Sequence, residues 1–164
     1  MFIGHLPGAY LVFRTATPGL DKAAFAAAMI GSIAPDIDLL WFYFVDNRSH
    51  HHHEYLTHRP LLWLGILTLG LLLWLRFPRA GLITAAFGAG GLVHMTLDSI
   101  VGEVAWAWPI FEFTHPLVVV QATHSHWILS FLSHWTFKIE IAITLLAAYV
   151  WWTSRRKKQQ GLEG

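Results

Sequence analysis

The fold is decided by residues 61–100, which read LLWLGILTLGLLLWLRFPRAGLITAAFGAGGLVHMTLDSI. Two apolar runs, Leu61–Leu75 and Ala80–Ile100, flank a tight basic turn around Pro78. Helices satisfy their own backbone hydrogen bonds in lipid, and about 20 apolar residues cross a bilayer. The stretch therefore predicts two antiparallel membrane helices. Four glycines in the second run allow close helix contact: Gly81, Gly88, Gly90 and Gly91.

The composition of the whole chain also indicates a membrane protein. Of its 164 residues, 55% are hydrophobic and 13% are charged, against roughly 25% charged residues in an ordinary soluble domain. The mean hydropathy is +0.47, and the tryptophans, nine in all, are typical interfacial anchors. The absence of cysteine excludes disulfides, thiolate metal ligands and cysteine nucleophiles. Any bound metal is therefore held by nitrogen and oxygen.

The remaining apolar segments predict an all-α chain. The runs Phe2–Phe13 and Lys22–Ile33 are each about 12 residues long, shorter than the ~20 residues of an upright span. The second run stops before Pro35, because the residue preceding proline avoids the α region. An aromatic stretch follows over Leu39–Val45, and the last helix covers Trp135–Trp152.

Residues Val101–Ser133 contain tryptophans and prolines without a regular period, which is typical of an interfacial cap or re-entrant segment. We expect an all-α integral membrane helical bundle of about four to five helices with this segment as a cap. Residues 1–154 then form a single membrane-embedded domain and residues 155–164 a basic cytoplasmic tail. No cleavable signal peptide is expected, because Arg14 follows the first apolar run instead of preceding it.

The basic residues sort to one side of the membrane if successive helices alternate direction. Eight of the eleven then lie in the cytoplasm, as the positive-inside rule requires: Arg14, Lys22, Arg76, Arg79, Arg155, Arg156, Lys157 and Lys158. The same alternation of helix directions places most histidines and carboxylates at the periplasmic or exterior face. We therefore expect a multi-pass protein of the inner (plasma) membrane, with a site facing outward and a cytoplasmic C-terminus.

The eleven histidines are unusual in so short an apolar chain, because imidazole is costly to bury in lipid unless it lines a polar cavity or binds something. His94 and Asp98 are four residues apart on a predicted helix and can reach one ion. A simple hydrogen bond between them is the alternative. Asp36 and Asp38 are predicted to lie in an extended stretch, both on one face. Their alternative role is a helix cap.

Further histidines lie in the polar segment Asp46–Arg59. His53 and His58 precede a predicted membrane helix and are candidate ligands. The run His50–His52 is interpreted as a solvated loop that binds metal adventitiously, and His115 as a loop histidine.

Together these residues resemble a known family. The residues are Gly4-His5, Pro35-Asp36-Ile37-Asp38, the spacing from His53 through Thr57 to His58, and His94-x-x-x-Asp98 followed by Trp108-Pro109. They look like motifs of the membrane-bound metal-dependent hydrolases, also described as LexA-binding, inner-membrane-associated hydrolases, over roughly residues 4–110. That family is helical, and its ligand order is similar to that of zinc-dependent phospholipase C.

The resemblance implies a set of metal ligands: His5, Asp36, His53 or His58, His94 and Asp98, with Asp98 bridging two ions. A more distant likeness implies a third-ion set of His126, His134 and Glu140. The sequence departs from the family where Glu54-Tyr55 replaces Arg-Gly and Arg59 replaces Ser.

The ligand types point to metal-dependent hydrolysis. Imidazole and carboxylate suit Zn²⁺ best, with Mn²⁺ or Fe²⁺ as alternatives, and we expect one to three ions. A bound ion activates water and stabilises a developing oxyanion. Asp38 or Glu54 is then the candidate general base, and Arg59 the candidate phosphate ligand. A site at the bilayer surface favours a phospholipid or a lipid-linked phosphate as substrate.

A metal-binding or metal-transport protein is the main alternative, and a purely structural membrane protein is another. A transport path needs polar groups in mid-membrane, where the segments Leu61–Leu75 and Ile141–Trp152 offer only Thr68 and Thr144. Nucleic-acid binding is not expected, because the only basic cluster is the short tail, which suits anionic lipid headgroups.

Overall fold

The computed structural model describes residues 3–49, 52–111 and 113–161, and these ranges contain helices and loops without a strand. The elements, in chain order, are α1 (His5–Ala16), α2 (Lys22–Gly31), η1 (Pro35–Ile37), α3 (Asp38–Phe44), η2 (His52–Glu54), η3 (Leu56–His58), α4 (Pro60–Trp74), α5 (Pro78–Asp98), α6 (Trp127–Ser133) and α7 (Trp135–Gln159). The all-α prediction is confirmed over this part of the chain. Phe2, His50 and His51 lie outside the described residues.

Only part of the chain meets the length and apolarity of a membrane span. Among the described residues, α5 is the one single helix that is long and apolar enough to cross a membrane. Two bent pairs pass when each is taken together: α2 with η1 and α3, bent by 50°, and α6 with α7, bent by 67°. The apolar helix α4 is shorter, at 15 residues. One to three candidate spans result, so the expected multi-helix membrane bundle is supported in part.

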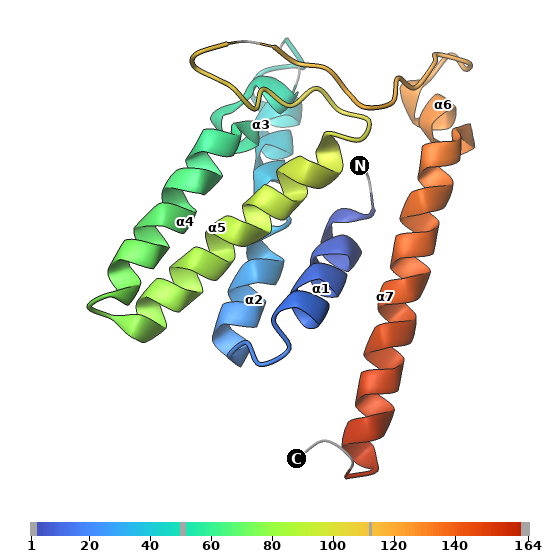
Figure 1. The fold of residues 1–164 in the computed structure, drawn as a ribbon. Coiled ribbons are helices and arrows are strands. Elements are labelled where there is room, and N and C mark those ends of the chain that lie inside the picture. The colour runs from blue at the N-terminus through green and yellow to red at the C-terminus, as the bar shows by residue number, and fades with distance from the viewer. Residues whose placement is uncertain (1–2, 50–51, 112, 162–164) are drawn as a thin grey trace.

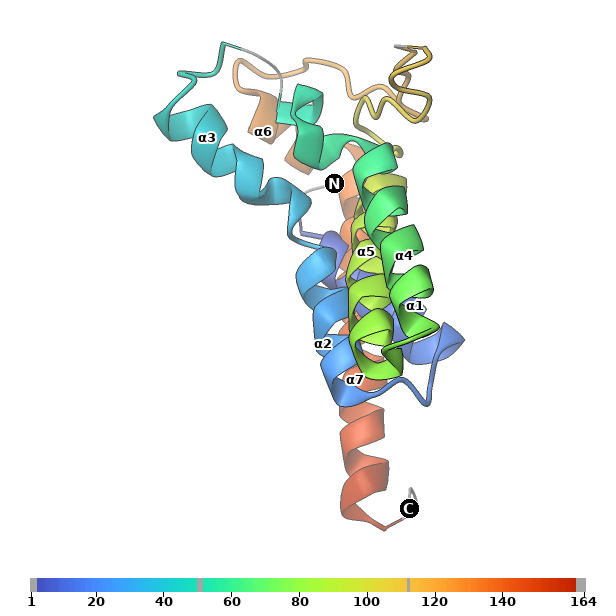
Figure 2. The ribbon, with the colours of Figure 1, turned by 90° about the vertical axis from the view of Figure 1, so that its left-hand side faces the viewer.

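The helices form a bundle with two distinct ends (Figure 1). The α1–α2 turn, the α4–α5 turn and the C-terminal end of α7 lie at one end, in both views (Figures 1 and 2). The long connection from α5 to α6 crosses the other end, near the N-terminus. The α1–α2 and α4–α5 turns, which carry basic residues, thus lie at one end of the bundle, and the expected role of the α5–α6 connection as an interfacial cap stays a prediction.

Close packing of α5 depends on its glycines. A Cβ placed on Gly90 would lie 2.2 Å from the backbone oxygen of Ala28 in α2, and one on Gly81 would lie 2.2 Å from the backbone nitrogen of Trp74 in α4. Small residues let helix backbones approach closely in membrane proteins. The α2 and α4 backbones therefore rest directly against α5, which fixes the segments that follow them.

The expectation that Asp36 and Asp38 lie in an extended stretch is wrong. Residues Pro35–Ile37 form a 3-10 turn, and Asp38 is the first residue of α3. Proline is well suited to the first position of a helical turn, where its missing N–H is not needed. A 3-10 helix has 3.0 residues per turn, so residues two positions apart, such as Asp36 and Asp38, are separated by roughly 240° around its axis. The two carboxylates therefore point in different directions.

The last helix is longer than the sequence predicted. The interval Trp135–Trp152 was expected, whereas α7 continues to Gln159 and includes Arg155 and Arg156. Their guanidinium groups lie over the rings of Trp151 and Trp152, at 4.5 and 3.9 Å from the ring centroids. Cation–π contacts of this kind contribute a favourable attraction of roughly 0.5–1 kcal/mol at exposed sites.

Candidate metal centre

Four imidazoles surround the carboxylate of Asp98, the last residue of α5, and the fourth, His53 Nε2, lies 3.6 Å from Asp98 Oδ2. His5 Nε2, at the start of α1, lies 2.9 Å from Asp98 Oδ1. His94 Nε2 lies 3.0 Å from Asp98 Oδ2, and His58 Nε2 lies 3.6 Å from the same oxygen. His58 and His94 are 0% exposed and Asp98 is 1% exposed. Three separate segments therefore deliver polar side chains to one buried point.

Asp36 approaches the same point from the α2–α3 junction. Its Oδ1 lies 3.8 Å from Nε2 of both His58 and His94, and its Oδ2 lies 3.8 Å from His5 Nδ1. The Asp36 side chain is 34% exposed, unlike the histidines beside it. Asp36 thus lies on the side of the cluster that opens to solvent.

The spacing of these atoms suits a divalent ion. Ligands at 2.0–2.1 Å around a tetrahedral Zn²⁺ are separated from one another by about 3.3 Å. The nitrogen–oxygen separations given above, from 2.9 to 3.8 Å, bracket that value. Two sets of three side chains here have ligand atoms within 4.8 Å of one another, namely His5, His94, Asp98 and Asp36, His58, His94. Both sets could hold a metal ion.

Hydrogen bonds aim two of the imidazoles. His94 Nδ1 lies 2.8 Å from the backbone oxygen of Ser32, and His58 Nδ1 lies 2.5 Å from Asp38 Oδ2. Each Nδ1–H donates outward, so each Nε2 faces the cluster. Both Nε2 atoms are buried and make no hydrogen bond within the described part of the chain. Metal-ligating histidines typically have this arrangement, with the second ring nitrogen held by a carboxylate or a carbonyl.

The electrostatics of His58 favour a positive charge at the cluster. Burial lowers the pKa of the His58 ring, but hydrogen bonds and charge attraction from Asp38 and Asp98 outweigh it and raise the pKa to about 9. In the absence of metal, a proton on His58 thus offsets the buried carboxylates at neutral pH. A bound cation would meet the same need.

Comparison with known proteins agrees with a membrane location. The model of the YdjM inner membrane protein family matches residues 1–160. The chain belongs to the YdjM inner membrane protein family. No curated protein and no solved structure matches it. The membrane part of the resemblance seen in the sequence is thereby confirmed, and its hydrolase part stays a prediction.

The cluster in this YdjM-family chain gives Asp38 a role other than the predicted general base. Asp38 is 6% exposed, and its Oδ2 accepts hydrogen bonds from His58 Nδ1 and, at 2.6 Å, from Thr57 Oγ1. A buried carboxylate held in this way positions the histidine and is poorly placed to take a proton from water. Asp38 and His58 are both visible in the sequence, but the sequence does not show that Asp38 binds Nδ1 of His58.

The other two predicted catalytic residues lie in or beside the η2–η3 segment. Glu54 is exposed, and its backbone oxygen accepts a 3.0 Å hydrogen bond from the guanidinium of Arg59. Arg59 also lies 5.4 Å from the ring centroid of Trp108. The Arg59 guanidinium therefore contacts Glu54 and Trp108 and not a carboxylate of the candidate metal centre.

The structure does not bring the predicted third-ion set into the cluster. His126 is exposed, and its Nδ1 accepts from the backbone of Ile128. His134 Nδ1 lies 2.9 Å from Thr136 Oγ1. Glu140 is 1% exposed, and its carboxylate binds backbone N–H groups just before His5. These three residues have other structural partners in this YdjM-family chain.

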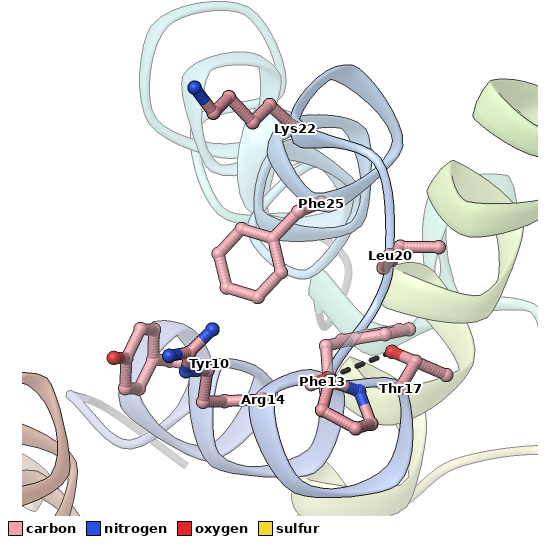
Figure 3. Close-up of a pocket in the computed structure, with 8 residues that line it drawn as sticks. Tyr10, Phe13, Arg14, Thr17, Leu20, Lys22 and Phe25 are labelled. Atoms are coloured by element: carbon pink, nitrogen blue, oxygen red, sulfur yellow. Dashed lines mark hydrogen bonds between the residues drawn. The ribbon is translucent and has the colours of Figure 1, made fainter. Parts of the chain in front are cut away.

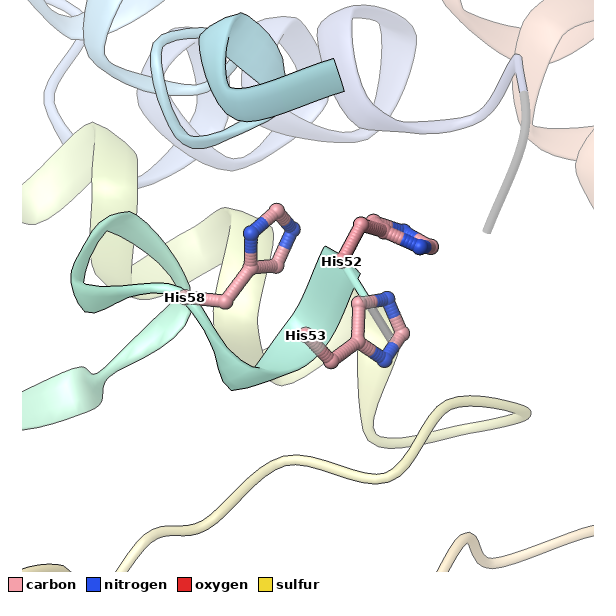
Figure 4. Close-up of side chains that lie close together, drawn as sticks. All are labelled: His52, His53 and His58. Carbon is pink, nitrogen blue, oxygen red and sulfur yellow. The ribbon is translucent and has the colours of Figure 1, made fainter. Parts of the chain in front are cut away.

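Sequence reasoning underrated His52. Its ring lies with those of His53 and His58, and the three form another set with ligand atoms within 4.8 Å (Figure 4). The sequence signal is that His52 immediately precedes His53, but a run of identical residues does not show that His52 lies beside the cluster.

A separate pocket lies between the start of α2 and the end of α1 (Figure 3). Tyr10, Phe13, Phe25 and the basic residues Arg14 and Lys22 line it. It is at the end of the bundle opposite the connection from α5 to α6 (Figure 1). It therefore contributes nothing to the metal centre of this YdjM-family chain.

Proposed function

We propose that this chain is a metal-dependent hydrolase of the inner membrane, acting as a phosphoesterase on a phospholipid or lipid-linked phosphate. One observation carries the proposal: five side chains with metal-ligating groups converge on a buried point at one end of the bundle. They are His5, Asp36, His58, His94 and Asp98. Three nitrogens and two carboxylates are the donors that Zn²⁺ or Mn²⁺ accepts.

The residues around the ligands support a functional ion over a chance cluster. Asp38 and the backbone oxygen of Ser32 accept the Nδ1–H groups of His58 and His94, which is the usual arrangement of metal-ligating histidines. Buried imidazole nitrogens without a hydrogen bond destabilise a fold by about 1–3 kcal/mol each. An ion at this point removes that cost.

The centre offers the chemistry of metal-assisted hydrolysis. When bound, a divalent ion lowers the pKa of coordinated water to about 7 and stabilises charge on a phosphoryl oxygen. Asp36, at the solvent side, leaves an approach for water and for substrate. Arg59 follows His58 directly and supplies a guanidinium for a phosphate oxygen, and the exposed Glu54 remains the candidate general base.

Apolar side chains near the centre favour a lipid substrate. In α3 and its surroundings, Ile37, Leu40 and Phe44 are 63%, 60% and 81% exposed. On the connection after α5, Ile110 and Leu117 are each 78% exposed. Exposed apolar groups on this scale suit contact with acyl chains. We place this end of the bundle at the periplasmic face, because the basic turns lie at the other end.

The proposal is tested with detergent-purified protein that carries a tag without histidine. Phosphodiester hydrolysis of phospholipids and phosphomonoester hydrolysis of lipid phosphates are measured in mixed micelles, before and after chelation and after zinc or manganese is restored. We expect turnover that is lost on chelation and regained with metal. Stoichiometric metal without turnover, together with metal flux into liposomes, would favour the transport alternative instead.

A further inference from the structure

We infer that the centre holds two ions, and that His52, His53 and His58 bind the second. This inference rests on the proposed function, since it assumes a metal centre, and it adds a second site with two ligands, His52 and His53, that are not among the first five side chains. The argument starts from a count of the ring nitrogens that can bind.

Each imidazole of the cluster offers one nitrogen to one ion. His94 Nδ1 is engaged by Ser32, and His58 Nδ1 by Asp38, so only Nε2 remains on each ring. Of the three sets that fit an ion, the His5–His94–Asp98 set and the His52–His53–His58 set share no residue. Both can therefore be occupied at once. The Asp36–His58–His94 set takes one histidine from each, which places Asp36 between the two sites.

The carboxylate of Asp98 also lies between the two sites. Its Oδ1 is 2.9 Å from His5 Nε2, while its Oδ2 is 3.6 Å from Nε2 of both His53 and His58. One carboxylate thus presents oxygen to both triads. Paired ions in hydrolytic enzymes lie about 3.5–4 Å apart and need such shared negative charge to offset their repulsion.

The three histidines are held in place by packing. The His52 ring lies 4.1 Å from that of His53 and 5.2 Å from that of His58, measured between centroids, and 6.0 Å from the ring of Phe42 in α3. His53 rests against the chain after α5, where a Cβ on Gly102 would lie 2.3 Å from its Cε1. His53 is 8% exposed and His52 half-buried. Figure 4 shows the three rings on the η2–η3 segment.

A site of this composition has a clear chemical use. Three neutral imidazoles around a tetrahedral ion leave an open position for water, as in catalytic zinc sites. With the first ion beside it, the pair can stabilise both the attacking and the leaving oxygen of a phosphodiester. The second site therefore deepens the phosphoesterase proposal.

The test is metal stoichiometry, because it does not depend on activity. Wild-type protein with a histidine-free tag is purified in detergent, loaded with Zn²⁺, passed through gel filtration and analysed for zinc per chain. We expect about two ions in wild type and about one in His52→Ala and in His52→Gln, which keeps a polar side chain if alanine impairs folding. His51→Ala, the neighbour in the run, should keep both ions.

The outcomes separate the inference from the proposed function. Two ions in the His52 variants, or equal losses in His51→Ala and His52→Ala, would overturn the second site, the latter by showing adventitious binding along the run. One ion in wild type would overturn it too, while leaving the proposed single-ion hydrolase intact. A wild-type protein that retains no zinc would remove the basis of both.

Discussion

The carboxylate of Glu140 in α7 accepts the backbone N–H of Gly4 at 3.0 Å, across a separation of 136 residues. It also accepts the N–H of Ile3 at 2.6 Å. Helix α1 begins at His5, and its N-cap residue, Gly4, provides no side-chain hydrogen bond of its own. Free N–H groups at a helix start need acceptors. Glu140 therefore caps α1 from another helix and fixes the position of His5.

From this contact we predict that Glu140→Ala weakens metal binding although Glu140 is not a ligand in the structure. The N–H groups of Ile3 and Gly4 lose their acceptor, at a cost of about 1–3 kcal/mol for the buried N–H of Gly4, and His5 loses its fixed position. Glu140→Gln keeps one acceptor oxygen and should restore most of the affinity. Zinc affinity is measured by competition with a chelating dye, with Thr144→Val, one turn further along α7, as control. Wild-type affinity in Glu140→Ala would contradict the prediction.

Asp98→Asn should be the most damaging single carboxylate change. The amide keeps the size of the side chain but lacks the charge that lies within 3.0 Å of His5 and His94. We expect loss of bound metal and of hydrolysis together, with a lower Tm in the metal-loaded comparison. His115→Ala, an exposed loop histidine, is the matched control. Full metal occupancy with unchanged turnover in Asp98→Asn would contradict the assignment of Asp98 as a metal ligand.

Metal affinity should rise with pH between about 6.5 and 9. The pKa of His58 is raised from its usual 6.5 to about 9, so the metal-free folded chain holds a proton there that the unfolded chain loses earlier. The stability from that proton is complete below pH 6.5 and is lost as pH rises through 9. An ion must displace the proton. Calorimetry at pH 7 in buffers of different ionisation enthalpy should therefore show proton release, which Asp38→Asn should reduce.

Gly90→Ala should destabilise the bundle and the centre together. The new Cβ would lie 2.2 Å from the backbone oxygen of Ala28, so α2 must move, and with it the Ser32 oxygen that orients His94. We expect a loss of about 1–3 kcal/mol and weaker zinc binding. Gly65→Ala in α4 has nothing within 4 Å of its Cβ and serves as control. Equal stability of both variants would disprove the close α2–α5 contact.

The orientation can be tested with single cysteines, because the chain has none of its own. Ser49→Cys lies in the exposed loop after α3, and Gln159→Cys ends α7. We expect an impermeant maleimide to label the first in intact cells and the second only after permeabilisation. The reverse pattern would place the centre on the cytoplasmic side.

The sequence predicted those features that depend on local geometry. The two apolar runs become α4 and α5. The helical spacing of four residues brings His94 Nε2 to 3.0 Å from Asp98 Oδ2. The convergence of His5 and Asp36 on the same point was also foreseen, from the threading of helices and from the resemblance. Each of these follows from periodicity or from alternation of direction.

The features that sequence missed depend on contacts between distant segments or on backbone detail. Asp38 was a candidate general base, whereas the 3-10 turn directs its carboxylate to His58. Glu140 was assigned to a metal from a distant family likeness, and its backbone partners, 136 and 137 residues away, cannot be seen in the sequence pattern. His52 was hidden in a run of identical residues.

The ligands are spread over chain segments that enter a membrane at different times. His5 belongs to α1, which is synthesised before α5, and Asp98 is the last residue of α5. A chain arrested before α5 lacks both ligands that this helix contributes, and a chain threaded with one segment inverted separates His5 or Asp36 from the rest. The amount of bound zinc would then depend on correct membrane insertion. In a population of inserted chains, the metal-to-protein ratio would measure the fraction in which every helix has its final orientation.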